Sequence, residues 1–276
     1  MGLRINTNVA ALNAQRMLGN STKAMNESLE RLSSGSRINK AGDDAAGLAI
    51  SENLKGQIRG LRQAKRNASD GISLVQVTEG GLNEISNILV RLRELSVQAA
   101  SDTIGDSERA FTDREFQSLK NEIQRIAETT TYNGTPLLSG RDKPIDIQVG
   151  IYNSGNDRLS YDTKFADSRL QALGMQDEQV MTKSGAQMSL AKIDDGLKHV
   201  NEVRSSLGAM QNRLQSTINN LSIFDENLSA ANSRIRDADV AAESSEMVKQ
   251  QILQQAGVAV LGHANSSQQN ALKLLG

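Results

Sequence analysis

The most regular hydrophobic pattern in the chain runs from Met188 to about Ala231, where apolar residues return every seven positions. A seven-residue repeat with a second apolar row is typical of a coiled coil or a helical bundle. The pattern predicts one helix of about 44 residues, which at 1.5 Å per residue measures roughly 65 Å and needs long helical partners. The predicted seam positions are Ile193, Val200, Leu207, Leu214, Leu221 and Leu228.

The first half of the chain supplies the predicted partners. A polar stretch, Ser101–Ser107, contains Gly105 and several residue types that cap helices, so we expect two helices joined by a turn there. Apolar positions with helical spacing lie on both sides of this stretch, at Leu82, Ile85, Leu89, Leu92, Leu95 and Ala99 before it and at Phe116, Leu119, Ile123 and Ile126 after it.

The middle of the chain shows the alternation that is typical of strands. Turn-forming residues at Tyr152–Asp157 separate two short alternating runs, which predicts a small β-hairpin region at about 140–165. Its apolar positions are Ile145, Ile147 and Val149 before the turn and Leu159 and Tyr161 after it.

Both ends of the chain carry apolar stripes that are diluted with Ala, Asn, Gln and Ser. Each stripe is long enough for a helix, but neither helix alone hides its apolar face. Two interpretations remain open: ordinary terminal helices docked on the core, or helices that become fully buried only against other copies of the chain. Five glycines between Ser33 and Gly60 predict a shaped connector at about 33–60.

Composition supports a mainly α fold, an elongated antiparallel helical bundle or coiled-coil rod with the hairpin region in its middle. The 276 residues include two prolines and seven aromatic residues, so long uninterrupted helices are permitted and a thick globular core is not expected. Without cysteine there is no disulfide framework and no thiolate metal site. A net charge of −1 gives no basic field that would attract nucleic acid. The sequence contains no run of 18 apolar residues, so no membrane-spanning segment is predicted.

Residues for catalysis or metal binding are scarce. His199 and His263 are the two histidines, they lie in different segments, and neither belongs to a zinc or hydrolase motif. Asp43 and Asp44 are adjacent and therefore do not face each other on a regular element, so we expect them to cap the helix that follows. The sequence predicts no enzyme, no cofactor and no metal site.

Several long blocks closely resemble bacterial flagellin over roughly residues 1–150 and 186–276. At the amino-terminal end the blocks are INTNVAALNAQ, SLERLSSGSRINKAGDDAAGLAI, RNASDGISLVQVTEGGLNEI, VRLRELSVQAA and NEIQRIAETTTYNGTPLL. At the carboxyl-terminal end the block ANSRIRDADVAAESSEMVKQQILQQAG precedes a leucine-rich tail.

The resemblance implies a structural subunit that polymerises into the flagellar filament and serves motility. It implies that residues 1–40 and 235–276 pair as helices of the filament's inner tube, that 41–234 form the rod, and that a short variable segment lies at about 150–186. The assembly positions we expect at the termini are Ile5, Val9, Leu12, Val248, Ile252, Leu272 and Leu275.

The resemblance also implies partners and a location. Flagellins are exported unfolded through the flagellar type III apparatus, so we expect a secreted, extracellular protein that meets itself, an export chaperone, a cap and hook-associated proteins. Family members are recognised by Toll-like receptor 5, and matching positions here are Leu89, Arg91, Leu95 and Glu115. Val90, His263 and Ser267 depart from the residues that many members carry.

Three other functions share some of these sequence features. A hook–filament junction protein shares related terminal segments, and a soluble coiled-coil adaptor would share the heptads. A filament with a built-in protease would need a zinc motif in the variable region, and residues 150–186 contain no histidine.

Overall fold

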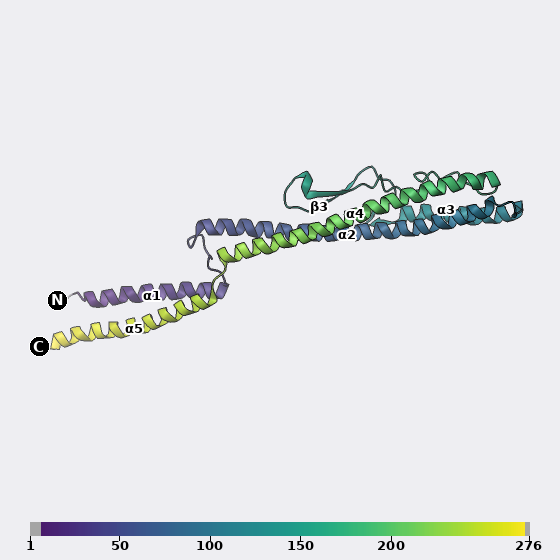
Figure 1. Ribbon diagram of the computed structural model, residues 1–276. Helices are drawn as coiled ribbons and strands as arrows, with labels where there is room; N and C mark the ends of the chain where they lie inside the picture. The colour runs from purple at the N-terminus through teal and green to yellow at the C-terminus, as the bar shows by residue number, and fades with distance from the viewer. Residues whose placement is uncertain (1–6, 274–276) are drawn as a thin grey trace. The chain divides into compact units, whose positions relative to one another are not determined.

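The computed structural model describes residues 7–273, with the backbone alone described for 268–273 (Figure 1). It forms two compact units, one made of residues 1–56 and 227–276 and the other of residues 57–226. The described chain contains five α-helices: α1 (Val9–Ser34), α2 (Ala45–Ala100), α3 (Asp106–Thr129), α4 (Lys183–Arg236) and α5 (Val240–Lys273). The predicted mainly α fold with a small β region in mid-chain is confirmed.

The larger unit is built on α2, α3 and α4, which lie alongside one another (Figure 1). Their facing apolar residues form one continuous core that includes Leu82, Leu92, Phe116 and Ile123, each fully buried. The first five seam positions, from Ile193 to Leu221, are buried, and Leu228 is half-buried.

A short turn joins α2 to α3, as the polar stretch predicts. The buried Arg109 holds it: its Nε donates to Ala99 O at 2.9 Å and its Nη2 donates to Ser101 O at 2.9 Å. These carbonyls end α2 and have no helical partner, so a cationic side chain satisfies them where the helix dipole is negative. Asp106 pairs with the same guanidinium at 2.9 Å.

Two antiparallel ribbons lie in mid-chain. Strand β3 (Ile145–Gln148) pairs with β4 (Arg158–Tyr161) with Ile147 opposite Leu159, and a 3₁₀ turn precedes β4 at Gly155–Asp157, which confirms the predicted hairpin. The sequence did not predict the second ribbon, β1 (Thr131–Tyr132) with β2 (Thr135–Pro136). Asn133 and Gly134 close it with φ of 48° and 74°, the two positive angles that a tight two-residue hairpin turn requires.

The predicted connector at about 33–60 is too long. Helix α2 already begins at Ala45, and Asp44 Oδ1 accepts from Gly47 N at 2.8 Å, which confirms the expected cap. Asp43 instead accepts from the backbone of Asn39 and Lys40 and shapes the preceding loop. Glycine lowers helix stability by only about 1 kcal/mol, so a helix of this length tolerates it where packing compensates. At Gly60 the missing Cβ makes room for Ile151, whose Cγ2 would lie 2.9 Å from it.

Residues 162–182, inside the predicted variable segment, form no helix or strand. They nevertheless bury Leu173, Met175 and Val180 in the core of the larger unit. This stretch is therefore part of that unit's packing.

Candidate functional site: the terminal helices

Helices α1 and α5 of the smaller unit lie side by side and run in opposite directions (Figure 1). Polar contacts at three positions along the two helices join them. Asn8 Nδ2 donates to Ala264 O at 3.0 Å, Gln254 Nε2 donates to Thr22 Oγ1 at 3.4 Å, and Arg31 Nη1 lies 3.0 Å from Glu243 Oε1. Asn8 also begins α1, because its Oδ1 accepts from Ala11 N at 2.9 Å.

The chain segments before α2 and before α5 are joined by backbone hydrogen bonds. Arg37 N donates to Arg236 O at 2.6 Å, and Ala238 N donates to Gly35 O at 3.0 Å. Gly35 adopts φ 68°, the left-handed conformation that ends α1 at a C′ position. The Arg236 guanidinium also donates to Glu52, which lowers the pKa of that carboxyl. The two segments are thus fixed to each other within the smaller unit.

The half-buried face of α5 is mostly polar or small, and Met247 and Leu261 are its large apolar residues. The half-buried positions of α5 are Glu243, Ser244, Glu246, Met247, Gln250, Gln254, Gly257, Leu261 and Ala264. The other branched aliphatic side chains that the structure describes on α5 are exposed, among them Val248 at 47%, Ile252 at 60% and Val260 at 55%. An amphipathic helix of a monomeric protein normally shows the reverse arrangement.

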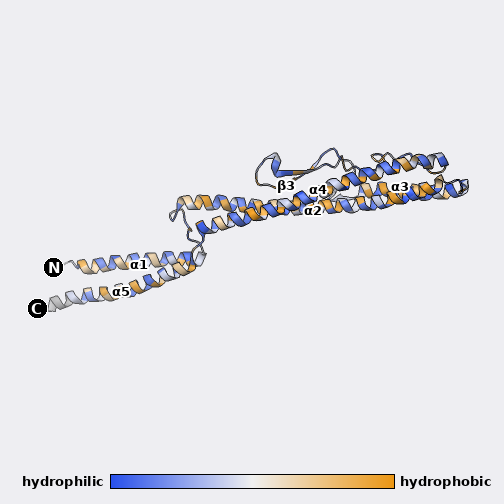
Figure 2. Ribbon diagram, in the orientation of Figure 1, coloured by the Kyte–Doolittle hydropathy of each residue, from blue (hydrophilic) through white to orange (hydrophobic). Residues whose placement is uncertain are grey.

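Helix α1 shows the same property at its start. Val9 is 63% exposed and Leu12 58%, and Ser28 is the single buried residue of α1. Figure 2 shows apolar residues distributed along both helices among polar ones. Large apolar side chains exposed in such number on two paired helices favour a surface that other chains cover.

The structure therefore places four of the expected assembly positions, Val9, Leu12, Val248 and Ile252, on exposed surface. Ile5 and Leu275 lie outside the described residues, and so does the side chain of Leu272.

The four residues expected at a receptor surface divide into two groups. Arg91 Nη2 lies 2.8 Å from Glu115 Oε1 at the surface, where α2 meets α3. A second carboxylate, Glu94, lies 2.9 Å from Nη1, and both acids raise the pKa of Arg91. Leu89 and Leu95 are buried in the core and present no side-chain surface in this conformation.

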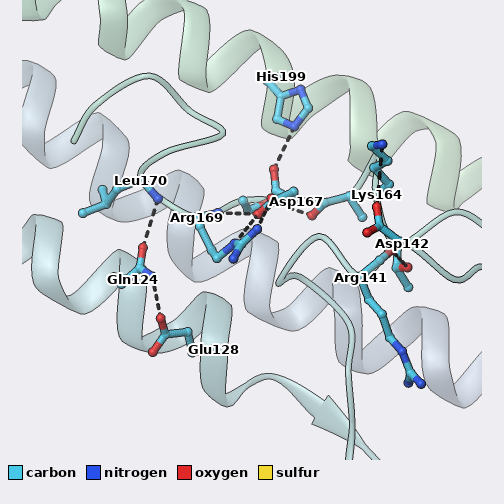
Figure 3. A network of polar contacts seen from close by, with 12 residues as sticks. Gln124, Glu128, Arg141, Asp142, Lys164, Asp167, Arg169, Leu170 and His199 are labelled. Carbon is cyan, nitrogen blue, oxygen red and sulfur yellow. Dashed lines mark hydrogen bonds and ion pairs between the residues drawn. The ribbon is translucent and has the colours of Figure 1, made fainter.

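No group of three His, Cys, Asp or Glu residues suited to a metal ion occurs among residues 7–273. Within the same range, no helix has the length and apolarity needed to cross a membrane. His199 packs edge-on against Phe165, and its Nε2 lies 3.1 Å from Asp167 O (Figure 3).

One set of polar residues on α3 was not predicted from the sequence. Four side chains on one face of α3 contact the backbone of the irregular stretch 162–182. Their spacing of four, three and four residues is a detectable helical signal. The set is Asp113, Gln117, Lys120 and Gln124.

Paired terminal helices that leave most of their large aliphatic side chains exposed are typical of a helical subunit of a self-associating structural protein. Family comparison agrees. Residues 5–143 match the bacterial flagellin N-terminal helical region, and residues 190–275 match the bacterial flagellin C-terminal helical region. The chain belongs to the bacterial flagellin family.

Relatives match over nearly the full length. A flagellin of Halalkalibacterium halodurans is 47% identical over 98% of this chain and 99% of the relative, and a flagellin of Bacillus subtilis is 43% identical over 99% and 100%. The crystal structure of Bacillus cereus flagellin aligns with a TM-score of 0.51 and 30% identity, covering 56% of this chain and 88% of that one. The chain is accordingly a structural subunit of the flagellar filament and not an enzyme, and it self-associates in that filament.

Proposed function

We propose that the chain is secreted through the flagellar export apparatus in an unfolded state and folds fully only as it joins the filament tip. The observation that carries this proposal is the exposed aliphatic surface of α5, where Val248, Ile252 and Val260 are each about half exposed beside a mostly polar half-buried face. Neighbouring copies that cover this surface would supply the burial that the isolated α1–α5 pair lacks, which couples ordering to addition. Head-to-tail contacts that do not close generate an open helical polymer.

Deletion and substitution together test this role. Chains that lack residues 1–30 or 245–276 should keep the helical signal of the larger unit and form no filaments. In the full-length chain, Ile252→Asp should block filament growth, because a carboxylate on a surface that becomes buried costs several kcal/mol at each contact, on the order of the penalty for an unpaired buried ion. Gln251→Asp adds the same charge beside it and serves as the control.

Electron microscopy after depolymerisation and regrowth gives the readout. Long filaments from either truncated chain would contradict the assembly model. If Ile252→Asp and Gln251→Asp grow filaments equally well, the outward face of α5 is not the contact surface.

Amide exchange in the monomer provides a second test. Exchange should be fast throughout α1 and α5 and slow at Leu207–Leu221, where the seam is buried. Equal protection in both regions would show that the terminal helices are stable without neighbours.

The proposed partners follow from the family resemblance. A cytoplasmic export chaperone would cover the same apolar face of α5 before secretion, and cap and hook-associated proteins would contact the subunit at the two ends of the filament. A solved hook-associated protein from Vibrio parahaemolyticus, 15% identical with a TM-score of 0.58, shares the fold alone. The full-length match to flagellins favours the filament subunit over a junction protein or an adaptor.

Recognition by Toll-like receptor 5 is proposed through the exposed pair Arg91 and Glu115. Replacing both by Ala should reduce receptor signalling by the monomer, and replacing the distant pair Arg62 and Asp225 should not. Equal signalling by both double variants would place recognition elsewhere.

A further inference from the structure

We infer that the stretch Asp162–Thr182 is a clasp that closes over the α3–α4 core, is held by side chains and not by a backbone ladder, and opens as a local unit controlled by Lys120. The clasp connects β4 to α4 and has no regular secondary structure. This inference concerns a conformational device in the larger unit and does not depend on how the chain is exported or assembled.

Side chains of α3 satisfy backbone groups of the clasp. Every buried N–H and C=O needs a hydrogen-bond partner, and an irregular segment cannot take them all from a neighbouring strand. Here Lys120 Nζ donates to Gln176 O at 3.0 Å and to Glu178 O at 2.8 Å. Gln117 Nε2 also donates to Glu178 O, at 3.1 Å.

Two further residues of the same α3 face extend this set. Asp113 Oδ1 accepts from Val180 N at 2.8 Å, and Gln124 Oε1 accepts from Leu170 N at 3.1 Å (Figure 3 shows the second contact). The four α3 residues thus contact the clasp over a stretch from Leu170 to Val180 and use both donors and acceptors. Such contacts recognise backbone groups of an irregular chain that lies along the helix.

The clasp also contributes three apolar side chains to the core. Met175 and Val180 are fully buried and Leu173 is 5% exposed, and all three belong to the core of the larger unit. A Cβ added at Gly196 of α4 would lie 3.5 Å from Met175 Sδ and 3.8 Å from Leu89 Cδ2. The clasp therefore occupies the space over Gly196, and its opening exposes an apolar strip between α3 and α4.

Lys120 is buried where it meets the clasp. The residue is 3% exposed, which is unusual for a lysine, and its ammonium lies 5.9 Å from the centre of the Phe116 ring. A buried cation is retained only where hydrogen bonds and nearby acids compensate for lost hydration. Both carbonyls that Lys120 contacts belong to the clasp, so an open clasp leaves the ammonium without them. Lys120 is in this sense a positioning residue for the clasp.

Contacts at the two ends define where the opening unit stops. At its start, Thr163 Oγ1 donates to Arg141 O at 2.7 Å, and Ser168 N donates to Leu138 O at 3.0 Å. Near its end, Ser189 Oγ donates to Glu178 Oε2 at 2.9 Å. The contacts of the clasp to α3 and to His199 can break without breaking any helical hydrogen bond, which is the condition for a local opening at lower free energy than global unfolding.

The experiment uses the absence of cysteine from the sequence, because one introduced thiol is a unique reporter. Met175→Cys places it under the clasp, and Val200→Cys places it in the α4 seam, where opening requires the helices to separate. Each is combined, in the depolymerised full-length chain, with Lys120→Met, which keeps much of the apolar stem and removes the ammonium. Lys192→Met, on exposed α4 surface, is the matched control. The rate of thiol modification is measured under native conditions.

Lys120→Met should accelerate modification at position 175 by about tenfold or more, the loss expected for charge-assisted hydrogen bonds, with little change at position 200. Lys192→Met should change neither rate. Equal acceleration at both positions would show that Lys120 acts only on global stability, and no acceleration at position 175 would show that it does not hold the clasp; either result overturns the inference.

If Lys120→Met reduces folding of the chain, Gln117→Ala gives the same test through a milder loss. It removes one hydrogen bond to Glu178 O and leaves the ammonium in place. It should accelerate position 175 selectively and by a smaller factor, and a uniform effect on both positions would contradict the clasp.

Discussion

Arg93 of α2 and Asp194 of α4 form an ion pair in which Nε lies 2.7 Å from Oδ1. A second pair joins the same helices, with Arg62 Nε 3.0 Å from Asp225 Oδ2. The two arginines are 31 positions apart, and so are the two aspartates. The antiparallel register of α2 and α4 is therefore kept over more than eight helical turns, at about 3.6 residues a turn.

The first prediction compares this surface pairing with the seam beneath it. Arg93→Ala should lower the free energy of unfolding by no more than about 1 kcal/mol, because both partners are about half exposed and solvent screens the pair. Leu207→Ala, at a position 2% exposed, should lower it by roughly 2–5 kcal/mol through lost burial and an unfilled cavity. Urea unfolding followed by circular dichroism measures both. A larger loss for Arg93→Ala than for Leu207→Ala would mean that ion pairs, not the seam, hold α2 against α4.

Two adjacent glycines of α2 give a second, matched prediction. At Gly80 an added Cβ meets nothing within 4 Å, so Gly80→Ala should raise stability by about 0.5–1 kcal/mol through helix propensity. At Gly81 the Cβ would lie 2.8 Å from Thr130 Oγ1 and 3.0 Å from Leu138 Cδ1, so Gly81→Ala should lower stability despite the same propensity gain. Thermal unfolding of the two variants decides. Stabilisation by both would mean that the β1–β2 region shifts freely on α2.

The third prediction concerns pH. Burial lowers the pKa of Lys120 below its usual 10.5, although Glu178, Asp113 and Asp177 act in the opposite direction. Between the folded pKa and 10.5 the unfolded chain holds more protons at this site, so its contribution to stability rises with pH, by at most about 1.4 kcal/mol per pH unit for one proton.

The comparison that isolates this effect is wild type against Lys120→Met, since other groups titrate in both. The free energy of unfolding of wild type minus that of the variant should increase as pH rises toward 10.5. A constant or shrinking difference would contradict a lowered pKa, and Lys192→Met should show no such pH-dependent difference from wild type.

The fourth prediction separates the two roles of Asn8. Asn8→Ala removes the cap of α1, worth about 1 kcal/mol, and should speed amide exchange at Ala11 and Leu12 roughly fivefold. Asn8→Asp keeps the acceptor at the positive end of the helix dipole and loses only the Nδ2 bond to Ala264 O, so exchange in this first turn should stay near wild type. Equal acceleration in the two variants would assign the effect to the contact with α5.

Local patterns predicted a large share of the molecule. The heptad positions from Ile193 to Leu214, the turn after Ala100 and the hairpin around Tyr152–Asp157 follow from spacing and turn chemistry alone. The start of α2 was not predicted correctly, because glycines such as Gly56 and Gly60 are typical of a connector. In the structure Gly60 lies inside the helix, where the lack of a Cβ makes room for Ile151.

The candidate site was predicted only in part, because local spacing identifies apolar positions but not the distant residues that they contact. Spacing identified Val248 and Ile252 as apolar positions of a terminal helix, but which face of α5 meets α1 depends on residues more than 200 positions away. Likewise, the burial of Leu89 and Leu95 beneath the Arg91–Glu115 pair is decided by how α2, α3 and α4 pack.

The sequence by itself determined the helices, their seam, the small β region, the cap at Asp44 and the family, because each depends on residue types at short, regular separations. Only the tertiary structure decided that α5 leaves most of its aliphatic side chains exposed beside a mostly polar half-buried face, and that residues 162–182 close over the core through contacts with α3. The physical reason is that the packing of distant segments decides which side chain satisfies a buried carbonyl or covers an apolar face. A lone lysine such as Lys120, which donates to two carbonyls, leaves no periodic pattern in the sequence.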